Sequence, residues 1–161
     1  MIPVLRPALP ADAIPLADIM VASRRAAMPW LAEPHSPAEA REWMAGSVLP
    51  HLAVRVAEVA GAMAGFAAWG HGWLHHLYIT PERQGQGAGA ALLAAAMAAN
   101  PEGLRLWAFQ RNARARGFYE RRGFVLVRLT DGAGNEEKEP DAEYHWRGLV
   151  PPSAARPAAG P

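Results

Sequence analysis

Residues 79–93 read ITPERQGQGAGAALL, and they place Gly85, Gly87 and Gly89 at alternate positions just before an alanine- and leucine-rich run. Glycine loses more backbone entropy on folding than any other residue, so three glycines so close together need a reason. The N-terminus of a helix presents unpaired N–H groups and a partial positive charge, and both attract anions. The stretch therefore predicts a helix start whose backbone an anionic ligand can approach closely.

Three phosphate-binding patterns compete for this stretch. A Walker A loop requires a lysine and a serine or threonine after its last glycine, but Ala90 and Ala91 follow Gly89. A dinucleotide fingerprint requires a third glycine, and Leu92 stands at that position. The third pattern, Q/R-x-x-G-x-G/A, fits residues 84–89 completely.

A second motif lies downstream, in the stretch NARARGFYERRGF. It places Asn112, Ala115, Phe118 and Tyr119 at N-x-x-A-x-x-F-Y spacing. With both motifs and the HLYITP stretch before the glycine loop, the sequence resembles the GNAT superfamily of acyl-CoA-dependent N-acetyltransferases. The resemblance covers roughly residues 3–148.

Composition is that of an ordinary globular domain: 161 residues, 51% hydrophobic and 19% charged, with a net charge of +1. A balance so close to neutral argues against a nucleic-acid or membrane-surface partner. The absence of cysteine excludes disulfides, thiolate zinc sites and a cysteine nucleophile. The start of the chain lacks the pattern of a signal peptide, and no apolar stretch is long enough to span a membrane, so we expect a cytoplasmic protein.

Hydrophobic periodicity and turn residues predict the order of the elements. Asp12 is expected to cap the first helix, and Ser36 and Glu39 form a capping-box pattern at the second. We expect strands over 3–6, 52–59, 61–70, 73–80, 103–109, 123–130 and 142–149, and helices over 10–26, 36–47, 87–99 and 112–122.

This order predicts a mixed sheet with helices on its faces. The resemblance implies an α/β (α+β) fold with a single domain, in which a mostly antiparallel central sheet is flanked by about four helices. We expect an N-acetyltransferase domain over residues 1–148 and a proline- and alanine-rich tail over 149–161.

The resemblance also implies acetyl-CoA as acyl donor, with no metal. The strand before the glycine loop would separate from the next parallel strand and leave a wedge for pantetheine, whose amides would pair with the strand backbone. Backbone amides at the start of the helix would bind the pyrophosphate. The residues expected to bind the cofactor are Leu77, Tyr78, Ile79, Gln84, Gly85, Gln86, Gly87, Ala88, Gly89, Ala90, Asn112 and Tyr119.

For catalysis, the resemblance places the hydroxyl of Tyr119 near the thioester sulfur, where it can protonate the departing thiolate. An amine must lose a proton before it attacks, and histidine suits that task at neutral pH. His75 and His76 are the candidate bases; neighbours on a strand point to opposite faces unless a bulge intervenes. Related sequences favour His75, and a purely structural histidine is the alternative. No third ligand at a recognisable spacing accompanies the pair, so we expect no metal site.

The acceptor is expected between two loops. Trp30 and His35 would bind it from one side. On the other side, the stretch 131–141 carries five carboxylates and one lysine; it would either attract a cationic amine or form a solvated hairpin. Four tryptophans fall in predicted strands and are expected to pack the core: Trp69, Trp73, Trp107 and Trp146.

The function that follows is an N-acetyltransferase in which a primary amine attacks acetyl-CoA directly in a ternary complex. Without cysteine, no thiol is available to carry the acyl group. The acceptor is a small-molecule or peptide amine, and a homodimer is common for such a fold. The alternatives are a non-catalytic acyl-CoA-binding or sensor domain and, more distantly, a module that binds NAD or ATP.

Overall fold

The computed structural model describes residues 2–149, so most of the predicted tail, residues 150–161, lies outside the described residues. One seven-stranded sheet has the order β1-β2-β3-β4-β5-β7-β6, and every neighbouring pair is antiparallel except β4 and β5. The predicted mixed, mostly antiparallel sheet is thus confirmed. The strands are β1 (Val4–Pro7), β2 (Ala53–Val59), β3 (Ala62–Gly70), β4 (Trp73–Ile79), β5 (Leu104–Phe109), β6 (Val125–Leu129) and β7 (Asp141–Trp146).

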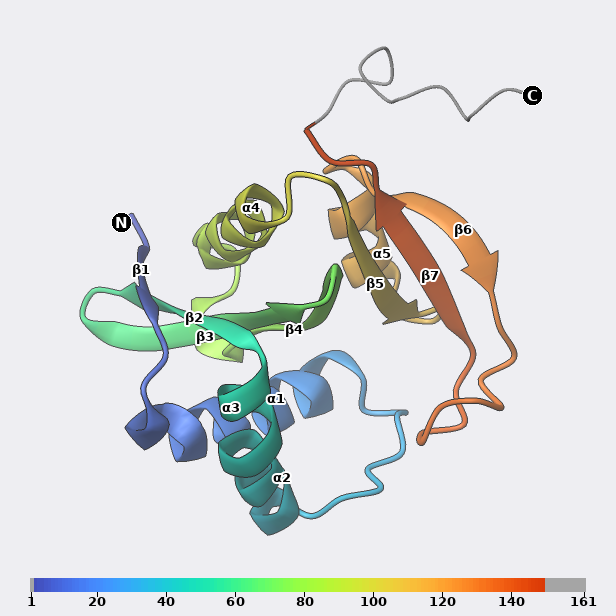
Figure 1. Cartoon of the computed structure of the whole chain (residues 1–161). Coiled ribbons are helices and arrows are strands. Elements are labelled where there is room, and N and C mark those ends of the chain that lie inside the picture. The colour runs from blue at the N-terminus through green and yellow to red at the C-terminus, as the bar shows by residue number, and fades with distance from the viewer. Residues whose placement is uncertain (1, 150–161) are drawn as a thin grey trace.

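Helices cover the sheet unevenly. In Figure 1, α1, α2 and α3 lie on one side of the strands β1 to β4, α4 lies on the other side, and α5 lies behind β5 and β7. The face of β5, β7 and β6 opposite α5 has no helix on it (Figure 1). The helices are α1 (Ala13–Ala27), α2 (Pro37–Trp43), α3 (Leu49–His51), α4 (Ala88–Ala99) and α5 (Ala113–Glu120).

The helix ends show which local predictions hold. The Ser36–Glu39 capping box is confirmed: each side chain accepts the backbone N–H of the other residue. The predicted cap at Asp12 is wrong, because its carboxylate pairs with Arg6 at 2.8 Å and accepts the N–H of Leu9. The electrostatic attraction of the nearby guanidinium outweighs a neutral capping bond.

The second predicted helix runs further than expected. After α2 it continues through a π-helical turn (Met44–Val48) into α3. Met44 and Val48 are both buried, so the continuation places two more apolar side chains in the core beneath β2 and β3. No helix in residues 2–149 combines the length and the apolar character that crossing a bilayer demands.

Two apolar cores lie on the two faces of the sheet. Leu92 and Leu93 of α4 have no exposed surface, and Leu16 of α1 is equally buried on the opposite face. The prediction that all four strand tryptophans pack the core holds for Trp69 and Trp146 and is wrong for the other two. Trp107 remains 41% exposed, because it alternates along β5 with the buried Leu106 and Ala108. Trp73 is half-buried and stacks on Trp107, with ring centroids 6.1 Å apart.

The parallel pair β4 and β5 is the feature that creates a site. The two strands pair at only two positions, Trp73 with Arg105 and Leu74 with Leu106, and then separate (Figure 1). The register of β4 against β3 shifts by one residue at His75, which marks a β-bulge where the strands part. We call this opening the β4–β5 fork; it is the wedge that the family resemblance implies.

Candidate active site

A cleft of about 430 Å³ lies between β4, the start of α4 and α5. We call it the glycine-loop cleft. Every residue expected to bind the cofactor lines it except Tyr78 and Gln86, and four arginines that the sequence analysis missed line it too. The lining of interest is Leu77, Ile79, Arg83, Gln84, Gly85, Gly87, Ala88, Gly89, Ala90, Asn112, Arg114, Phe118, Tyr119, Arg121 and Arg122.

The three glycines of the loop serve two different purposes. Gly85 and Gly87 have φ angles of +79° and +89°, which disfavour any residue with a side chain, and Gly87 directly precedes α4. Gly89 lies within the first turn of the helix. A Cβ built on it would lie 3.7 Å from both Ile79 and Phe118, which is ordinary contact, so its lack of a side chain keeps the cleft wide.

The four arginines give the cleft a cationic rim around the start of α4. Arg114 donates from Nη1 to Oε1 of Gln84 at 2.9 Å, and Gln84 donates from Nε2 to the carbonyl of Ile79 at 3.2 Å. Gln84 thus fixes the loop to the free edge of β4. The arginine-rich composition of residues 111–122 was visible in the sequence, but their direction depends on how α5 packs.

Tyr119 lies on α5 with its ring enclosed by other aromatic rings. Its ring centroid is 5.3 Å from that of Phe118 and 5.7 Å from that of Phe124. Within residues 2–149, its hydroxyl has no hydrogen-bond partner. Burial raises the pKa of the Tyr119 hydroxyl, and the nearby Tyr78 adds to the effect, so the group is protonated at neutral pH. Asn112 caps α5 by accepting the N–H of Ala115 at 3.2 Å.

The two candidate bases differ sharply in their surroundings. His75 is exposed, at the bulge. His76 packs against Trp43 and Tyr78, with ring centroids 5.1 and 6.0 Å away, and its Nδ1 is buried without a partner. Burial, followed by the charges of His75 and Arg24, lowers the pKa of His76 to about 3. His76 is therefore neutral near pH 7 and a weak base.

Tyr78 turns its side chain away from the glycine-loop cleft. Its hydroxyl accepts from Nη1 of Arg24 on α1 at 3.1 Å, and Nη2 of the same arginine lies 3.3 Å from Glu137. This chain of contacts ties β4 and α1 to the loop between β6 and β7. The three residues are far apart in the sequence, so no local pattern predicts the connection.

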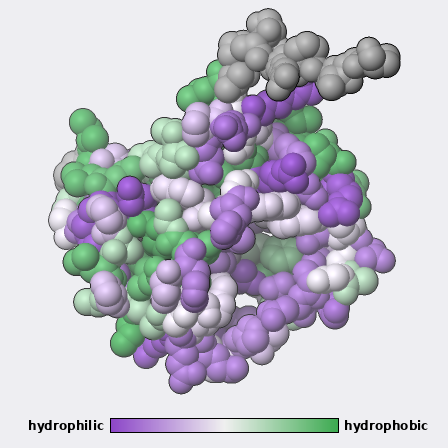
Figure 2. Space-filling model, viewed as in Figure 1, coloured by the Kyte–Doolittle hydropathy of each residue, from purple (hydrophilic) through white to green (hydrophobic). Residues whose placement is uncertain are grey.

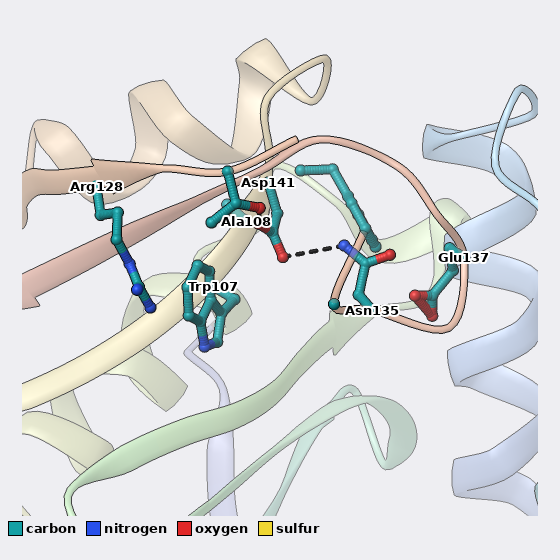
Figure 3. A pocket seen from close by; sticks show the side chains of 9 residues that line it. Trp107, Ala108, Arg128, Asn135, Glu137 and Asp141 are labelled. Carbon is teal, nitrogen blue, oxygen red and sulfur yellow. Dashed lines mark hydrogen bonds between the residues drawn. The ribbon is translucent and has the colours of Figure 1, made fainter. Parts of the chain in front are cut away.

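A second cavity, of about 540 Å³, lies on the other side of the fork. We call it the β6–β7 cavity. Figure 3 shows it between β5 and the loop that follows β6, and Figure 2 shows a hollow with an apolar floor and a polar rim near the ends of α1 and β5. The cavity is lined by Trp107, Ala108, Phe109, Arg128, Thr130, Gly134, Asn135, Glu137 and Asp141.

Both cavities border the β4–β5 fork. Trp107, Ala108 and Phe109 are the three β5 residues that follow its last pair with β4, and they line the β6–β7 cavity. Leu77 and Ile79 belong to the separated part of β4 and line the glycine-loop cleft. Two ligands can thus approach the fork from different sides.

The predicted acceptor residues lie at the edge of this arrangement, and neither belongs to the lining of the β6–β7 cavity. Trp30 meets the ring of Phe109 edge-on at 6.4 Å, and the Arg111 guanidinium lies over its other side at 4.2 Å. His35 is exposed and lies 2.8 Å from Glu136, which raises its pKa. Through these contacts, Trp30 connects the α1–α2 loop to β5, and His35 connects it to the loop between β6 and β7.

No group of three or more histidine, aspartate or glutamate side chains suited to a metal ion occurs among residues 2–149. Near the fork, Nδ1 of His76 is buried without a hydrogen-bond partner, and Glu137 forms an ion pair with Arg24.

Comparison with known proteins shows a match to one family model and a fold shared with solved structures. Residues 50–126 match the sequence model of the acetyltransferase (GNAT) domain family. This range begins before β2 and ends in β6, so it includes the fork, the glycine loop and Tyr119. No curated protein matches the sequence.

Solved structures share the fold over most of the chain. YjaB from Escherichia coli, in its apo form, has 23% identity and a TM-score of 0.75, covering 92% of this chain and 99% of its own. A GCN5-related N-acetyltransferase, named aminotransferase class-II, from Rhodopseudomonas palustris has 25% identity and a TM-score of 0.72, covering 91% and 96%.

A third structure contains a ligand. The PaiA N-acetyltransferase of Thermoplasma acidophilum, in complex with coenzyme A, has 16% identity and a TM-score of 0.68, covering 91% of this chain and 99% of its own. The match of residues 50–126 to the family model, together with a fold shared over nine-tenths of the chain, confirms the resemblance of this protein to the GNAT superfamily of acetyltransferases.

Proposed function

We propose that the protein transfers an acetyl group from acetyl-CoA to a primary amine, by direct attack of the amine within a ternary complex. The observation that carries this proposal is the presence of two separate cavities on the two sides of the β4–β5 fork. One suits the acyl donor and the other suits the acceptor. A single-substrate or purely binding function requires only one of them.

The glycine-loop cleft fits coenzyme A by its chemistry. The start of α4 offers backbone N–H groups to the pyrophosphate, with Arg83, Arg114, Arg121 and Arg122 around it. On the fork side, the backbone of Leu77–Ile79 has no strand partner, and apart from the Ile79 carbonyl, which accepts from Gln84, its polar groups are free for the amides of pantetheine. The complex of PaiA with coenzyme A shows that a protein of this fold holds the same ligand.

The bound thioester supplies an electrophilic carbon. The lone pair of the amine nitrogen forms the new N–C bond, the C–S bond breaks, and the sulfur leaves with the bonding electron pair. Tyr119 donates its hydroxyl proton to the sulfur, for which its raised pKa keeps the proton available. The nitrogen loses a proton as the amide forms, and that proton restores the Tyr119 hydroxyl. A free backbone N–H of β4 near the fork can stabilise the negative charge that forms on the carbonyl oxygen.

The amine must give up its extra proton before it attacks. We assign this step to His75, directly or through a water molecule, in preference to His76. His75 is exposed at the bulge where the fork opens, whereas the Nδ1 of His76 is enclosed and its pKa is far below neutral. A base must be reachable by the amine or by a bridging water, and only His75 of the two meets that requirement.

The test is acetyl transfer in a buffer without primary amines. Purified protein is mixed with acetyl-CoA and a panel of amines, free coenzyme A is measured with a thiol reagent, and the acetylated product is identified by mass spectrometry. Amine-dependent release of coenzyme A with a matching N-acetyl product supports the enzyme. Tight binding of acetyl-CoA without release for any amine contradicts it and favours the non-catalytic acyl-CoA-binding domain.

A further inference from the structure

A more specific inference concerns the acceptor amine, and it rests on the proposed function. We propose that it is an aliphatic diamine, which presents one neutral amine to the thioester at the β4–β5 fork while its second nitrogen, an ammonium, binds Asp141 in the β6–β7 cavity. The acetyl transfer itself is unchanged. What the structure adds is a carboxylate placed to select a second positive charge.

Most charges around the β6–β7 cavity already have partners. Glu137 lies 3.3 Å from Arg24, and Glu139 lies 3.5 Å from Arg111. The cavity's own arginine, Arg128, lies 3.0 Å from the buried Glu143. Because these charges are balanced inside the protein, they contribute little net attraction for a charged ligand.

Asp141 is the exception. Its carboxylate accepts from the Thr130 hydroxyl and from Nδ2 of Asn135, the latter at 3.1 Å, and both donors are neutral. Within residues 2–149, it forms no ion pair. Figure 3 shows Asp141 and Asn135 joined in the cavity wall. A carboxylate that is partly removed from water and lacks a cation favours a ligand that supplies one.

The register of the sheet sets the distance to the reacting carbon. Asp141 pairs with Phe109, three residues along β5 from Leu106, where the pairing with β4 ends. At about 3.3 Å per strand residue, Phe109 and its partner Asp141 are displaced by about 10 Å along the strand direction from the start of the fork. An ammonium held there is too far away to be the attacking nitrogen, so the attacking nitrogen must be a second one on the same molecule.

The wall between these two points is apolar. Trp107, Ala108 and Phe109 follow one another along β5, and Trp107 is 41% exposed. This wall suits the methylene groups that separate the two nitrogens, because burying them is favourable. An acceptor with a carboxylate gains less, since Arg128 is already paired with Glu143 and lies 5.2 Å from the centre of the Trp107 ring.

The test compares substrates in the unmodified protein. A series of α,ω-diamines of increasing length is compared with n-alkylamines of the same chain length and with amino acids, by kcat/KM for release of coenzyme A. We expect the best diamine to exceed its matched monoamine by at least about tenfold, as one charge-assisted hydrogen bond implies. Higher ionic strength should reduce this ratio.

Two variants locate the effect. Asp141→Asn keeps the shape of the side chain and removes its charge, so it should reduce the ratio of diamine to monoamine to within about threefold. Val125→Ala, on an exposed position of β6 outside the cavity lining, should leave the ratio unchanged. A melting temperature close to that of the wild type shows that Asp141→Asn has folded.

The outcomes separate this inference from the function on which it rests. If no amine is acetylated, the proposed function fails. If monoamines are acetylated as well as diamines, if amino acids are preferred, or if the diamine preference survives in Asp141→Asn, the transferase stands and the diamine assignment is overturned.

Discussion

The proposed general acid, Tyr119, acts through its hydroxyl group alone. Tyr119→Phe keeps the ring contacts with Phe118 and Phe124, and within the described chain it breaks no hydrogen bond. We expect kcat to fall about 100-fold, the usual size of a lost general acid, while KM for acetyl-CoA and the melting temperature stay nearly constant. Steady-state kinetics across a range of pH check this. Unchanged turnover at every pH would remove Tyr119 from the chemistry.

His76 tests the electrostatics of the same region through stability. Its folded pKa of about 3 lies below the ordinary histidine value, so between these two values the unfolded chain binds more protons and stability falls with falling pH. His76→Phe fits the aromatic surroundings and cannot be protonated. Its loss of unfolding free energy between about pH 7 and about pH 4.5 should be smaller than that of the wild type.

Denaturant unfolding at the two pH values measures the effect of His76→Phe. The wild type, measured in the same way at both pH values, is the reference. An equally steep loss of stability in His76→Phe would contradict the buried, neutral state described for His76.

At the residue scale, sequence reasoning succeeded where a motif is local and missed the exposure of Trp107. The N-x-x-A-x-x-F-Y spacing led to Asn112 and Tyr119, and both line the glycine-loop cleft. The exposure of Trp107 was predictable from strand alternation, because Trp107 shares its face of β5 with the exposed Arg105, opposite the buried Leu106. Its exposure results from the absence of a helix over that part of the sheet (Figure 1).

In the first turn of α4, Gly89 lowers the stability of the helix but leaves room for a ligand in the glycine-loop cleft. Gly89→Ala replaces a poor helix former by the best one, and the new methyl group makes only ordinary contacts with Ile79 and Phe118. We expect unfolding free energy to stay level or rise by up to about 1 kcal/mol. KM for acetyl-CoA should rise about tenfold, because the methyl group narrows the cleft.

Chemical unfolding and steady-state kinetics together test this opposition of stability and binding. Gly46→Ala is the matched control: Gly46 is also helical, its added Cβ meets nothing within 4 Å, and it lies outside the cleft lining. It should gain stability without a change in KM. Were Gly89→Ala to bind acetyl-CoA as tightly as the wild type, the ligand would not pass over the first turn of α4.

Most elements were predictable because their patterns are local. The Ser36 capping box fixed the start of α2, and the glycines at 85 and 87 fixed the start of α4. The continuation past Ser47, through Val48 into α3, was not predictable, since Gly46 and Ser47 read as a helix end. Burial of Met44 and Val48 in the core outweighs those local preferences.

At the level of the whole fold, the central consequence is a sheet that opens between β4 and β5, the one parallel pair among the described strands. The opening separates two cavities, one beside a helix start with arginines and one beside an acidic loop. The family resemblance implied this opening. The long-range contacts that shape the acceptor cavity could not be predicted from the sequence. Arg24 and Glu137 are 113 positions apart, and only the folded chain brings them together. A homodimer stays a prediction.

The most direct test of the account is calorimetric titration of the protein with acetyl-CoA, with coenzyme A, NAD and ATP as comparison ligands. A cleft built for the pyrophosphate and the pantetheine arm should bind acetyl-CoA and coenzyme A at one site with micromolar dissociation constants of about 1–100 μM, and NAD and ATP at least tenfold more weakly. A folded sample that binds none of them, or that binds NAD or ATP as tightly as acetyl-CoA, would contradict the assignment of the glycine-loop cleft to coenzyme A.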